Sequence, residues 1–159
     1  MTAFEAPRKL SPDDSLEDFC CGVPMVDDWA RSRAHGAERH GTAVVYVVRS
    51  GDVVAGLYSL SSHSVVREDV KGGWLKRNAS ESIPTILLGM LGVDRRFQGQ
   101  HLGSSLLGDA IRRSTLVAEQ IGARALLVDP VDDAARRFYE KYGFKAIPGM
   151  DRMFIPLRK

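Results

Sequence analysis

The sequence predicts a single α/β domain built on a mixed sheet, and three observations lead to that prediction. The chain has 159 residues, a usual length for one domain, and 44% of them are hydrophobic, enough for a core. Compact β-branched runs such as AVVYVV at 43–48 alternate with segments at helical spacing. Because helical segments separate the strand patterns at 83–93, 123–128 and 144–147, we expect crossover connections within the sheet.

The first half of the chain is expected to hold one helix and one hairpin. Residues 1–14 contain two prolines and no regular period, which indicates an irregular lead-in. Apolar residues at helical spacing predict a helix around 23–40. AVVYVV, the turn RSGD and the partner run at 53–62 then predict an antiparallel hairpin, and the polar stretch 63–82 predicts a flexible loop.

The second half is expected to begin with a buried strand and a long helix. The continuous apolar run at 83–93 is typical of a strand buried on both faces, and Gly89 and Gly92 within it predict a bulge or the close approach of another backbone or a ligand. From 102 onward an apolar stripe predicts a helix that ends at Gly122. The stripe comprises Leu102, Leu106, Leu107, Ala110, Ile111, Val117, Ala118 and Ile121.

The remaining elements are a strand, a helix and a closing hairpin. ARALLV at 123–128 predicts the next buried strand. Asp132 or Asp133 is expected to cap a helix that runs to about Tyr142, and FKAIPG and RMFIPL predict the final hairpin.

Charge and cysteine content exclude several classes of protein. With 22 Lys and Arg against 20 Asp and Glu, the net charge of +2 excludes a strongly basic nucleic-acid coat but not a local basic patch. Cys20 and Cys21 are adjacent, which disfavours a disulfide, and two ligands cannot fill a zinc site, so we expect no metal and a cytoplasmic protein. The sequence lacks a signal-peptide core and any apolar run near the ~20 residues that span a bilayer, so no membrane partner is expected.

The segment DRRFQGQHLGSSLL, residues 94–107, joins the apolar strand to the long helix. The first turn of a helix leaves backbone N–H groups without intrahelical partners, so the amides from Gln98 to Ser104 are suited to an anion such as a pyrophosphate. The segment lacks the Lys of a Walker loop and the spacing of a Rossmann motif. On these residues alone, a plain strand-to-helix turn remains the alternative.

This segment resembles the acetyl-CoA signature of the GCN5-related N-acetyltransferases (GNAT), which reads Gln/Arg-x-x-Gly-x-Gly/Ala. The matching residues are Gln98-Gly99-Gln100-His101-Leu102-Gly103, and a second matching block, AARRFYEKYGF, begins at Ala134. The resemblance covers nearly the whole chain and implies one acetyltransferase domain over 1–159. Its sheet would be mixed and mostly antiparallel, with flanking helices and splayed central strands that hold acetyl-CoA.

The resemblance also implies the residues of the site. The pyrophosphate would lie on the amides of 98–104, and the thioester carbonyl near the Val93 amide. Tyr139 matches the acid that returns a proton to the thiolate, although a core aromatic role is its alternative, and Phe138, Tyr142 and Phe144 are expected in the core. No residue stands out as a general base. The expected cofactor-binding residues are Leu91, Gly92, Val93, Gln98, Gly99, Gln100, His101, Leu102, Gly103, Ser104, Asp132 and Phe138.

His101 departs from the signature, which has Gly or Ala at that position. We expect a side chain to fit there only if the local φ is negative and Cβ points away from the phosphates. The imidazole would then either donate a hydrogen bond to the phosphates or face solvent.

Four blocks resemble one branch of the family, the toxins of toxin–antitoxin pairs that acetylate the amino acid on charged tRNA. They are FCCGVPMVDDWA, GTAVVYVV, RNASESIPTILLGMLGVD and GARALLVDPVDDAARRFYEKYGF. Val26 and Ala30 replace leucines of the branch, and Met90 stands where Arg is common. This resemblance implies an aminoacyl-tRNA substrate, a small ribbon-helix-helix antitoxin and a homodimer. The alternatives are an N-acetyltransferase of a small amine or protein N-terminus, and an inactive binding module.

A tRNA substrate requires basic residues around one cleft. Arg31 and Arg33 in the first helix and Lys76 and Arg77 in the long loop are the expected contacts, with a solvated surface as the alternative for each cluster. Trp74 would either stack on a terminal base or anchor the loop. Other basic residues considered for this surface are Arg39, Lys71, Arg112, Arg113, Arg136 and Arg137.

Overall fold

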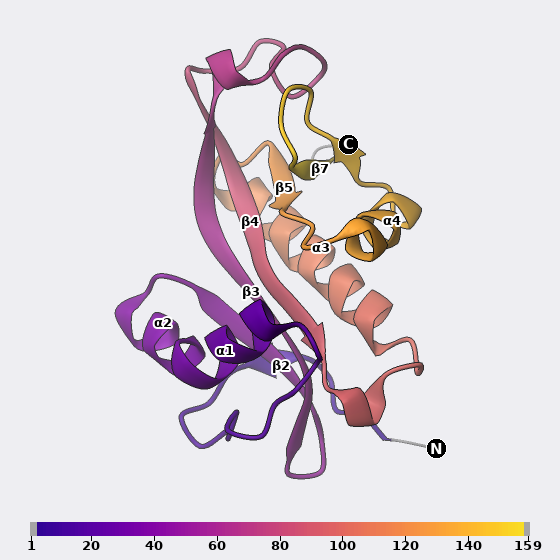
Figure 1. The fold of residues 1–159 in the computed structure, drawn as a ribbon. Helices are drawn as coiled ribbons and strands as arrows, with labels where there is room; N and C mark the ends of the chain where they lie inside the picture. The colour runs from indigo at the N-terminus through magenta and orange to yellow at the C-terminus, as the bar shows by residue number, and fades with distance from the viewer. Residues whose placement is uncertain (1–2, 158–159) are drawn as a thin grey trace. The chain divides into compact units, whose positions relative to one another are not determined.

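A computed structural model describes residues 3–157, so the first two residues of the predicted lead-in lie outside the described residues. Within the described part the strands form one sheet, in the order β1-β2-β3-β4-β5-β7-β6 (Figure 1). One strand pair, β4 with β5, is parallel, and the pairs β1–β2, β2–β3, β5–β7 and β6–β7 are antiparallel. The predicted α/β class with a mixed, mostly antiparallel sheet is therefore confirmed.

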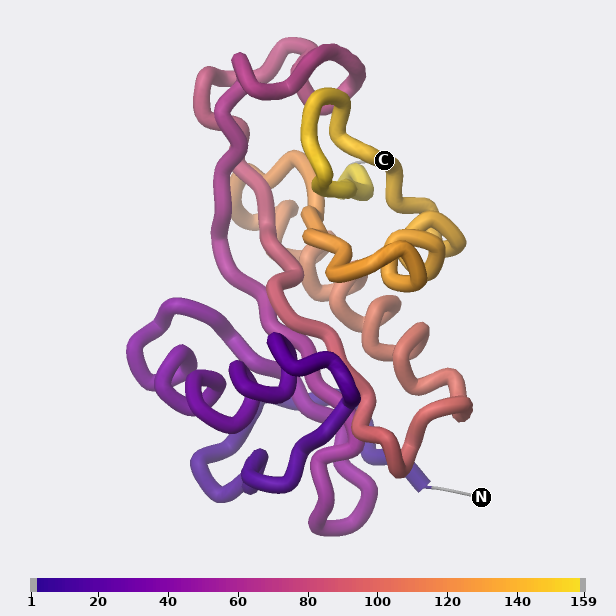
Figure 2. Tube along the Cα trace, viewed as in Figure 1, coloured from indigo at the N-terminus to yellow at the C-terminus, as the bar shows by residue number. Residues whose placement is uncertain are grey.

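The chain divides into two compact units. The first comprises Met1–Ser61 with Gly89–Ala110, and the second comprises Ser62–Leu88 with Ile111–Lys159. The long elements β3, β4 and α3 run through the boundary, as Figure 2 traces along the chain.

The first unit confirms the predicted hairpin and corrects the helix. Its elements are β1 (Arg8–Lys9), α1 (Pro24–Ser32), α2 (Ala34–His40), β2 (Val44–Ser50) and the first part of β3 (Val53–Val66). The single predicted helix is two helices, because the backbone leaves helical geometry at Arg33, with φ −126° and ψ −21°. The lead-in also contributes the two-residue strand β1, which pairs Arg8 with Val47.

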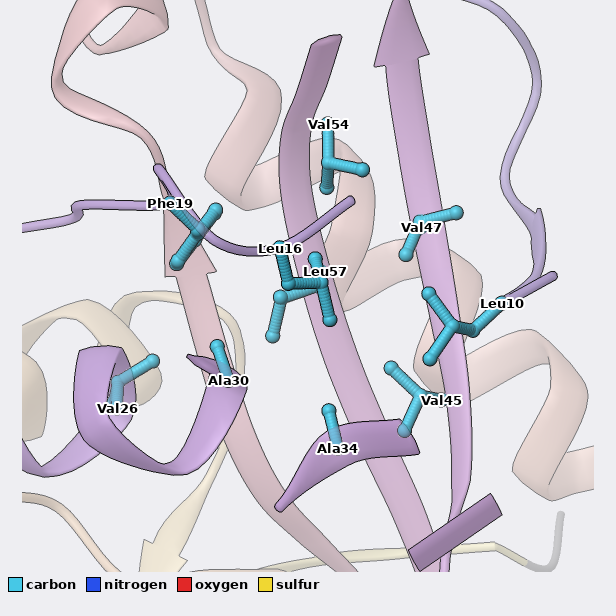
Figure 3. Close-up of a cluster of buried hydrophobic side chains, with 10 residues drawn as sticks. All are labelled: Leu10, Leu16, Phe19, Val26, Ala30, Ala34, Val45, Val47, Val54 and Leu57. Carbon is cyan, nitrogen blue, oxygen red and sulfur yellow. The ribbon is translucent and has the colours of Figure 1, made fainter. Parts of the chain in front are cut away.

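The core of the first unit lies between the two helices, the lead-in and the hairpin. Val26, Ala30 and Ala34 point from α1 and α2 toward the strands (Figure 3). They share one buried cluster with Val45 of β2 and Leu57 of β3. The cluster is completed by Leu10, Leu16, Phe19, Val47 and Val54. Val26 and Ala30, the two replacements of branch leucines, are thus both buried core residues.

Gly56 on β3 allows α3 to approach the sheet closely. A Cβ built at Gly56 would lie 2.8 Å from Leu106 Cδ1 and 3.3 Å from the Gly92 carbonyl oxygen. We expect Gly56→Ala to lower the free energy of unfolding by about 1–3 kcal/mol, because both neighbours must move. Gly108→Ala is the matched control: nothing lies within 4 Å of that position on α3, so alanine should raise the value by about 1 kcal/mol. Chemical denaturation measures both, and equal effects would contradict the packing argument.

The second unit confirms the parallel crossover and the closing hairpin. Its elements, in part shared with the first unit, are β4 (Ser82–Val93), α3 (Leu102–Gln120), β5 (Ala125–Val128), α4 (Asp133–Lys141), β6 (Lys145–Ala146) and β7 (Met153–Pro156), with a short 3-10 turn at Arg67–Asp69. A second 3-10 turn, Arg95–Phe97, lies in the first unit. Ile86 on β4 aligns with Leu126 on β5, and β7 lies between β5 and β6.

The predicted flexible loop at 63–82 is wrong in two respects. Its first residues belong to β3, which extends to Val66. Val70 and Leu75 are fully buried in the core of the second unit, together with Ile83, so the segment is anchored rather than free. Val70 and Leu75 stand singly in a polar stretch, without the regular spacing of a helix or a strand, so the sequence does not indicate that they are buried.

Burial of β4 and α3 is less complete than the sequence predicts. Ser82, Pro84 and Gly89 of β4 are exposed, so the strand is not buried on both faces. On α3 the stripe is buried at its N-terminal end, but Val117 is 40% and Ile121 is 64% exposed. The helix ends at Gln120, and Gly122 does not adopt the left-handed cap conformation.

Candidate active site

The turn between β4 and α3 has a conformation that depends on two left-handed residues. Gly99 has φ +80°, and a Cβ built there would meet nothing within 4 Å. His101 has φ +63°, and its carbonyl accepts hydrogen bonds from Ser105 N at 3.2 Å and Ser104 Oγ at 3.0 Å. These bonds to the His101 carbonyl lie at the start of α3, which begins at Leu102.

Three features of the turn bear on whether it could hold an anion. Among residues 3–157, the backbone amides of 98–104 donate no hydrogen bond to another described residue. They lie at the N-terminus of a 19-residue helix, where the helix dipole favours negative charge. Open space beside Gly99 permits close backbone approach. These donors, the dipole and the space would suit an anion of the size of a pyrophosphate.

The condition expected for His101 is wrong. Its φ is positive, so this residue occupies the left-handed conformation that glycine adopts most readily, with the side chain exposed. This conformation destabilises the folded state by about 1–2 kcal/mol for an L-residue. Histidine is among the non-glycine residues that adopt it more often than most.

Replacing His101 with glycine should relieve that strain. We expect His101→Gly to raise the free energy of unfolding by about 0.5–1 kcal/mol, which is the relieved strain less the extra entropy of glycine in the unfolded chain. Gln120→Gly, within the helical region of α3, should instead lower it by up to about 1 kcal/mol. Thermal or urea unfolding compares the two variants, and a destabilising His101→Gly would show that the imidazole makes a stabilising interaction.

The end of β4 is packed against side chains of the first unit. A Cβ on Gly89 would lie 3.1 Å from Ser59 Oγ, and one on Gly92 would lie 3.0 Å from Val26 Cγ1 and 3.2 Å from Cys21 Sγ. The sequence predicts a bulge, another backbone or a ligand at these glycines, whereas the groups nearest to both are side chains of the protein itself. Met90 donates its backbone N–H to Ser59 Oγ at 3.0 Å and packs against the core of the first unit. Leu91 and Val93 are half-buried.

Asp94, which the sequence did not single out, is a buried anchor of the turn. Its carboxylate accepts hydrogen bonds from Arg96 N at 3.0 Å, Arg96 Nε at 2.8 Å and Cys20 N at 3.1 Å. Burial alone would raise the pKa of Asp94, but the hydrogen bonds from Arg96 and Cys20 hold that pKa below its ordinary value. The carboxylate therefore stays ionised at neutral pH.

Tyr139, the expected acid, is a buried phenol on α4 in the second unit. It is 9% exposed, and its ring packs with centroid distances of 5.3 Å against both Phe138 and Phe144. Burial, with a further contribution from the negative charge of Asp129, raises the pKa of Tyr139 to about 12. The phenol is therefore fully protonated at neutral pH, as an acid must be before it acts.

The predicted helix cap and the predicted core aromatic residues at α4 agree with the structure only in part. Asp132 is the N-cap, and its carboxylate accepts the Ala135 N–H at 2.7 Å, which confirms one of the two predicted caps. Phe138 is half-buried, and Phe144 is buried as expected. Tyr142 is 37% exposed, so its predicted core position is wrong; α4 ends at Lys141, and Tyr142 follows as its C-cap.

The predicted tRNA-binding residues occupy both units. In the first unit, Arg31 donates to the Phe19 carbonyl from Nε at 2.9 Å and Nη2 at 2.6 Å, and Arg33 is exposed at the break between α1 and α2. In the second unit, Lys76 and Arg77 follow Trp74 in the segment between β3 and β4.

Trp74 lies in a groove of about 650 Å³ in the second unit. Its ring is parallel to Phe154, with centroids 6.3 Å apart, and the Arg124 guanidinium lies 4.2 Å from the ring centroid. Arg124 also donates to the carbonyls of Trp74 at 2.8 Å and Arg77 at 2.7 Å. These contacts support the alternative that Trp74 anchors the loop. Arg124 is 50 residues away from Trp74 in the sequence, so no local sequence signal indicated this contact.

Residues 3–157 contain neither a metal-binding cluster nor a membrane-spanning helix. No group of three or more His, Cys, Asp or Glu side chains in this range is arranged to hold a metal ion. No helix in this range is long and apolar enough to cross a membrane. Both cysteines are free thiols, and burial raises the pKa of Cys21 to about 11.

Comparison with known proteins identifies the class. Residues 41–146 match the model of the acetyltransferase (GNAT) domain, and the chain belongs to this family of N-acetyltransferases. A curated relative from Mycobacterium tuberculosis, "tRNA-acetylating toxin", is 40% identical over 148 residues, covering 93% of this chain and 89% of its own. "Probable toxin TacT" from Sinorhizobium fredii is 33% identical, covering 96% of this chain and 92% of its own.

Solved structures of low sequence identity share the fold. "AtaT complexed with acetyl-methionyl-tRNAfMet" superposes with a TM-score of 0.85 at 23% identity, over 97% of this chain and 95% of the other. A structure described as a bacterial toxin gives a TM-score of 0.89 at 20% identity, over 99% of this chain and 92% of the other. The predicted GNAT fold is thus confirmed.

Proposed function

We propose that this protein is an acetyl-CoA-dependent toxin that acetylates the amino group of aminoacyl-tRNA and so blocks translation. The observation that carries the proposal is the 40% identity, over 93% of the chain, to a relative named for tRNA acetylation. The anion cradle at 98–104 and the buried, protonated Tyr139 are the two features that such a reaction requires of the protein.

Each proposed role follows from the chemistry of acetyl transfer. Bound acetyl-CoA would supply the thioester. The amides of 98–104 would hold the negative charge of the pyrophosphate at the start of α3. The Val93 N–H would stabilise negative charge on a carbonyl oxygen, and the Tyr139 phenol would hold the proton that neutralises the departing thiolate. Proximity of the two substrates would supply much of the rate.

The finer parts of the proposal concern partners and assembly. We assign the tRNA contacts to Arg31, Arg33, Lys76 and Arg77, with Trp74 ordering the segment that carries the last two. The toxins of this branch also suggest a homodimer, a small ribbon-helix-helix antitoxin and a cytoplasmic location. We further propose that residues 1–159 act as one acetyltransferase domain.

Cell-free translation tests this function against the small-amine alternative. Addition of the protein with acetyl-CoA should stop synthesis, and fresh charged tRNA should restore it after the protein is removed. Tyr139→Phe with acetyl-CoA, and the natural protein without acetyl-CoA, should leave synthesis unchanged. Undiminished synthesis in the presence of acetyl-CoA would favour acetylation of a small amine or a protein N-terminus instead.

A further inference from the structure

The segment Phe19–Gly22 is held in place by side chains of α1 and by Asp94 and Arg95, all in the first unit. Asp27 of α1 accepts the N–H groups of Cys21 at 2.7 Å and Gly22 at 3.1 Å. Asp94 accepts the Cys20 N–H, and the Arg95 N–H donates to the Cys20 carbonyl at 2.8 Å. Arg31 covers the Phe19 carbonyl. A segment without regular secondary structure is thus almost completely hydrogen-bonded.

Gln98 adds the bonds that link this segment to the strand end. Its Nε2 donates to the Cys21 carbonyl at 2.9 Å and to the Val93 carbonyl at 2.9 Å. A carboxamide has two N–H hydrogens, and both are used by these carbonyls. What remains on the side chain is a carbonyl oxygen, which is an acceptor and does not favour a phosphate.

The bond to Val93 fixes a peptide plane. The carbonyl of the Val93–Asp94 peptide accepts from Gln98, and the N–H of the same peptide donates to the Ala55 carbonyl at 2.8 Å. Because a peptide is planar, anchoring both ends sets its orientation and therefore the direction in which β4 ends. The Val93 N–H, which we propose stabilises the oxyanion, is on the adjacent peptide.

We propose that Gln98 is a positioning residue, which fixes the Val93 backbone and the Phe19–Gly22 segment through its two hydrogen bonds rather than binding the pyrophosphate with its side chain. The catalytic part of this inference rests on the proposed function. It separates two roles within the signature: the amides of 98–104 bind the cofactor, and the Gln98 side chain orients the reacting end of β4.

The test uses the full chain with three variants. Gln98→Met keeps the length of the side chain and removes both donors. Gln98→Arg retains donors for two carbonyls, and Gln120→Met, an exposed residue of α3, is the matched control. For each variant, calorimetry measures the Kd for CoA, rapid quench measures single-turnover acetylation of charged tRNA, and hydrogen exchange follows the amides of residues 20–22.

For Gln98→Met we expect the single-turnover rate to fall by on the order of tenfold, with the Kd for CoA within about twofold of the natural protein. Exchange at residues 20–22 should rise, Gln98→Arg should restore both rate and protection, and Gln120→Met should change neither. A tenfold weaker Kd with an unchanged rate would show that Gln98 is a cofactor ligand, and an unchanged rate with unchanged exchange would also overturn the inference. If the natural protein acetylates no charged tRNA, the proposed function fails, whereas Kd and exchange still decide the role of Gln98.

Discussion

Tyr139→Phe should lower the rate of acetyl transfer by about 10²–10³-fold, the usual contribution of a general acid. Phenylalanine retains the ring that packs against Phe138 and Phe144, so the free energy of unfolding should change little. The Kd for CoA should also stay the same, because in the proposed function the amides of 98–104, and not Tyr139, bind the pyrophosphate. Single-turnover kinetics with saturating acetyl-CoA measures the loss.

The matched control for this variant is Tyr142→Phe. Tyr142 is exposed at the end of α4, and the substitution removes the same hydroxyl. It should leave the rate unchanged. Equal rates for Tyr139→Phe and the natural protein would assign Tyr139 to the core and leave the proton donor unidentified.

The raised pKa of Tyr139 also predicts the pH dependence. A general acid is active in its protonated form, so its contribution is complete below its pKa and is lost as the pH rises through that value. With a pKa of about 12, Tyr139 should cause no loss of rate between neutral pH and pH ~10, at which an ordinary phenol is half ionised. A loss centred near pH 10 that is absent in Tyr139→Phe would show that the phenol is not shielded in this way.

Ser104→Glu should have the second large effect, and its two consequences have opposite signs. A carboxylate in the first turn of α3 interacts favourably with the helix dipole, which contributes about 0.3–1 kcal/mol to the free energy of unfolding. The substitution also removes the hydrogen bond from Ser104 Oγ to the His101 carbonyl, which offsets part of this gain. The free energy of unfolding should therefore stay the same or rise. The same charge would repel a pyrophosphate held by the neighbouring amides. The Kd for CoA should therefore rise at least tenfold, as calorimetry would detect.

Ser104→Gln separates charge from size, since glutamine has the shape of glutamate without its charge. The difference in Kd between the two variants should shrink as ionic strength is raised, because salt screens exposed charges. Equal affinities for CoA in both variants at low salt would place the pyrophosphate elsewhere than at the start of α3.

Much of the fold was predictable because the signals were local. The hairpin 43–62, the strand 83–93 and the helix that begins at Leu102 all have strong periodicity in consecutive residues, and the structure confirms them. The missed features lack such a signal. Strand β1 has only two residues and depends on pairing with β2, and the placement of β7 between β5 and β6 is a property of the sheet rather than of any segment.

The candidate site shows the same division. The glycine turn and Tyr139 were found from short motifs in the sequence. The interactions that hold the surrounding backbone are long-range: Gln98 bonds to a carbonyl 77 residues away, and Arg124 to carbonyls almost fifty residues away. The left-handed conformation of His101 was missed because few non-glycine residues adopt it and no local sequence signal marks it.

The central claim is that this acetyltransferase acts on the amino group of aminoacyl-tRNA. Incubation of the protein with labelled acetyl-CoA and a pool of charged tRNA tests it most directly, with deacylated tRNA, free amino acids and a peptide mixture as parallel acceptors. We predict label on charged tRNA that is released as N-acetylamino acid by mild base, no label on deacylated tRNA, and a loss of about 10²–10³-fold with Tyr139→Phe. Label on free amino acids or peptides with none on charged tRNA would contradict the account.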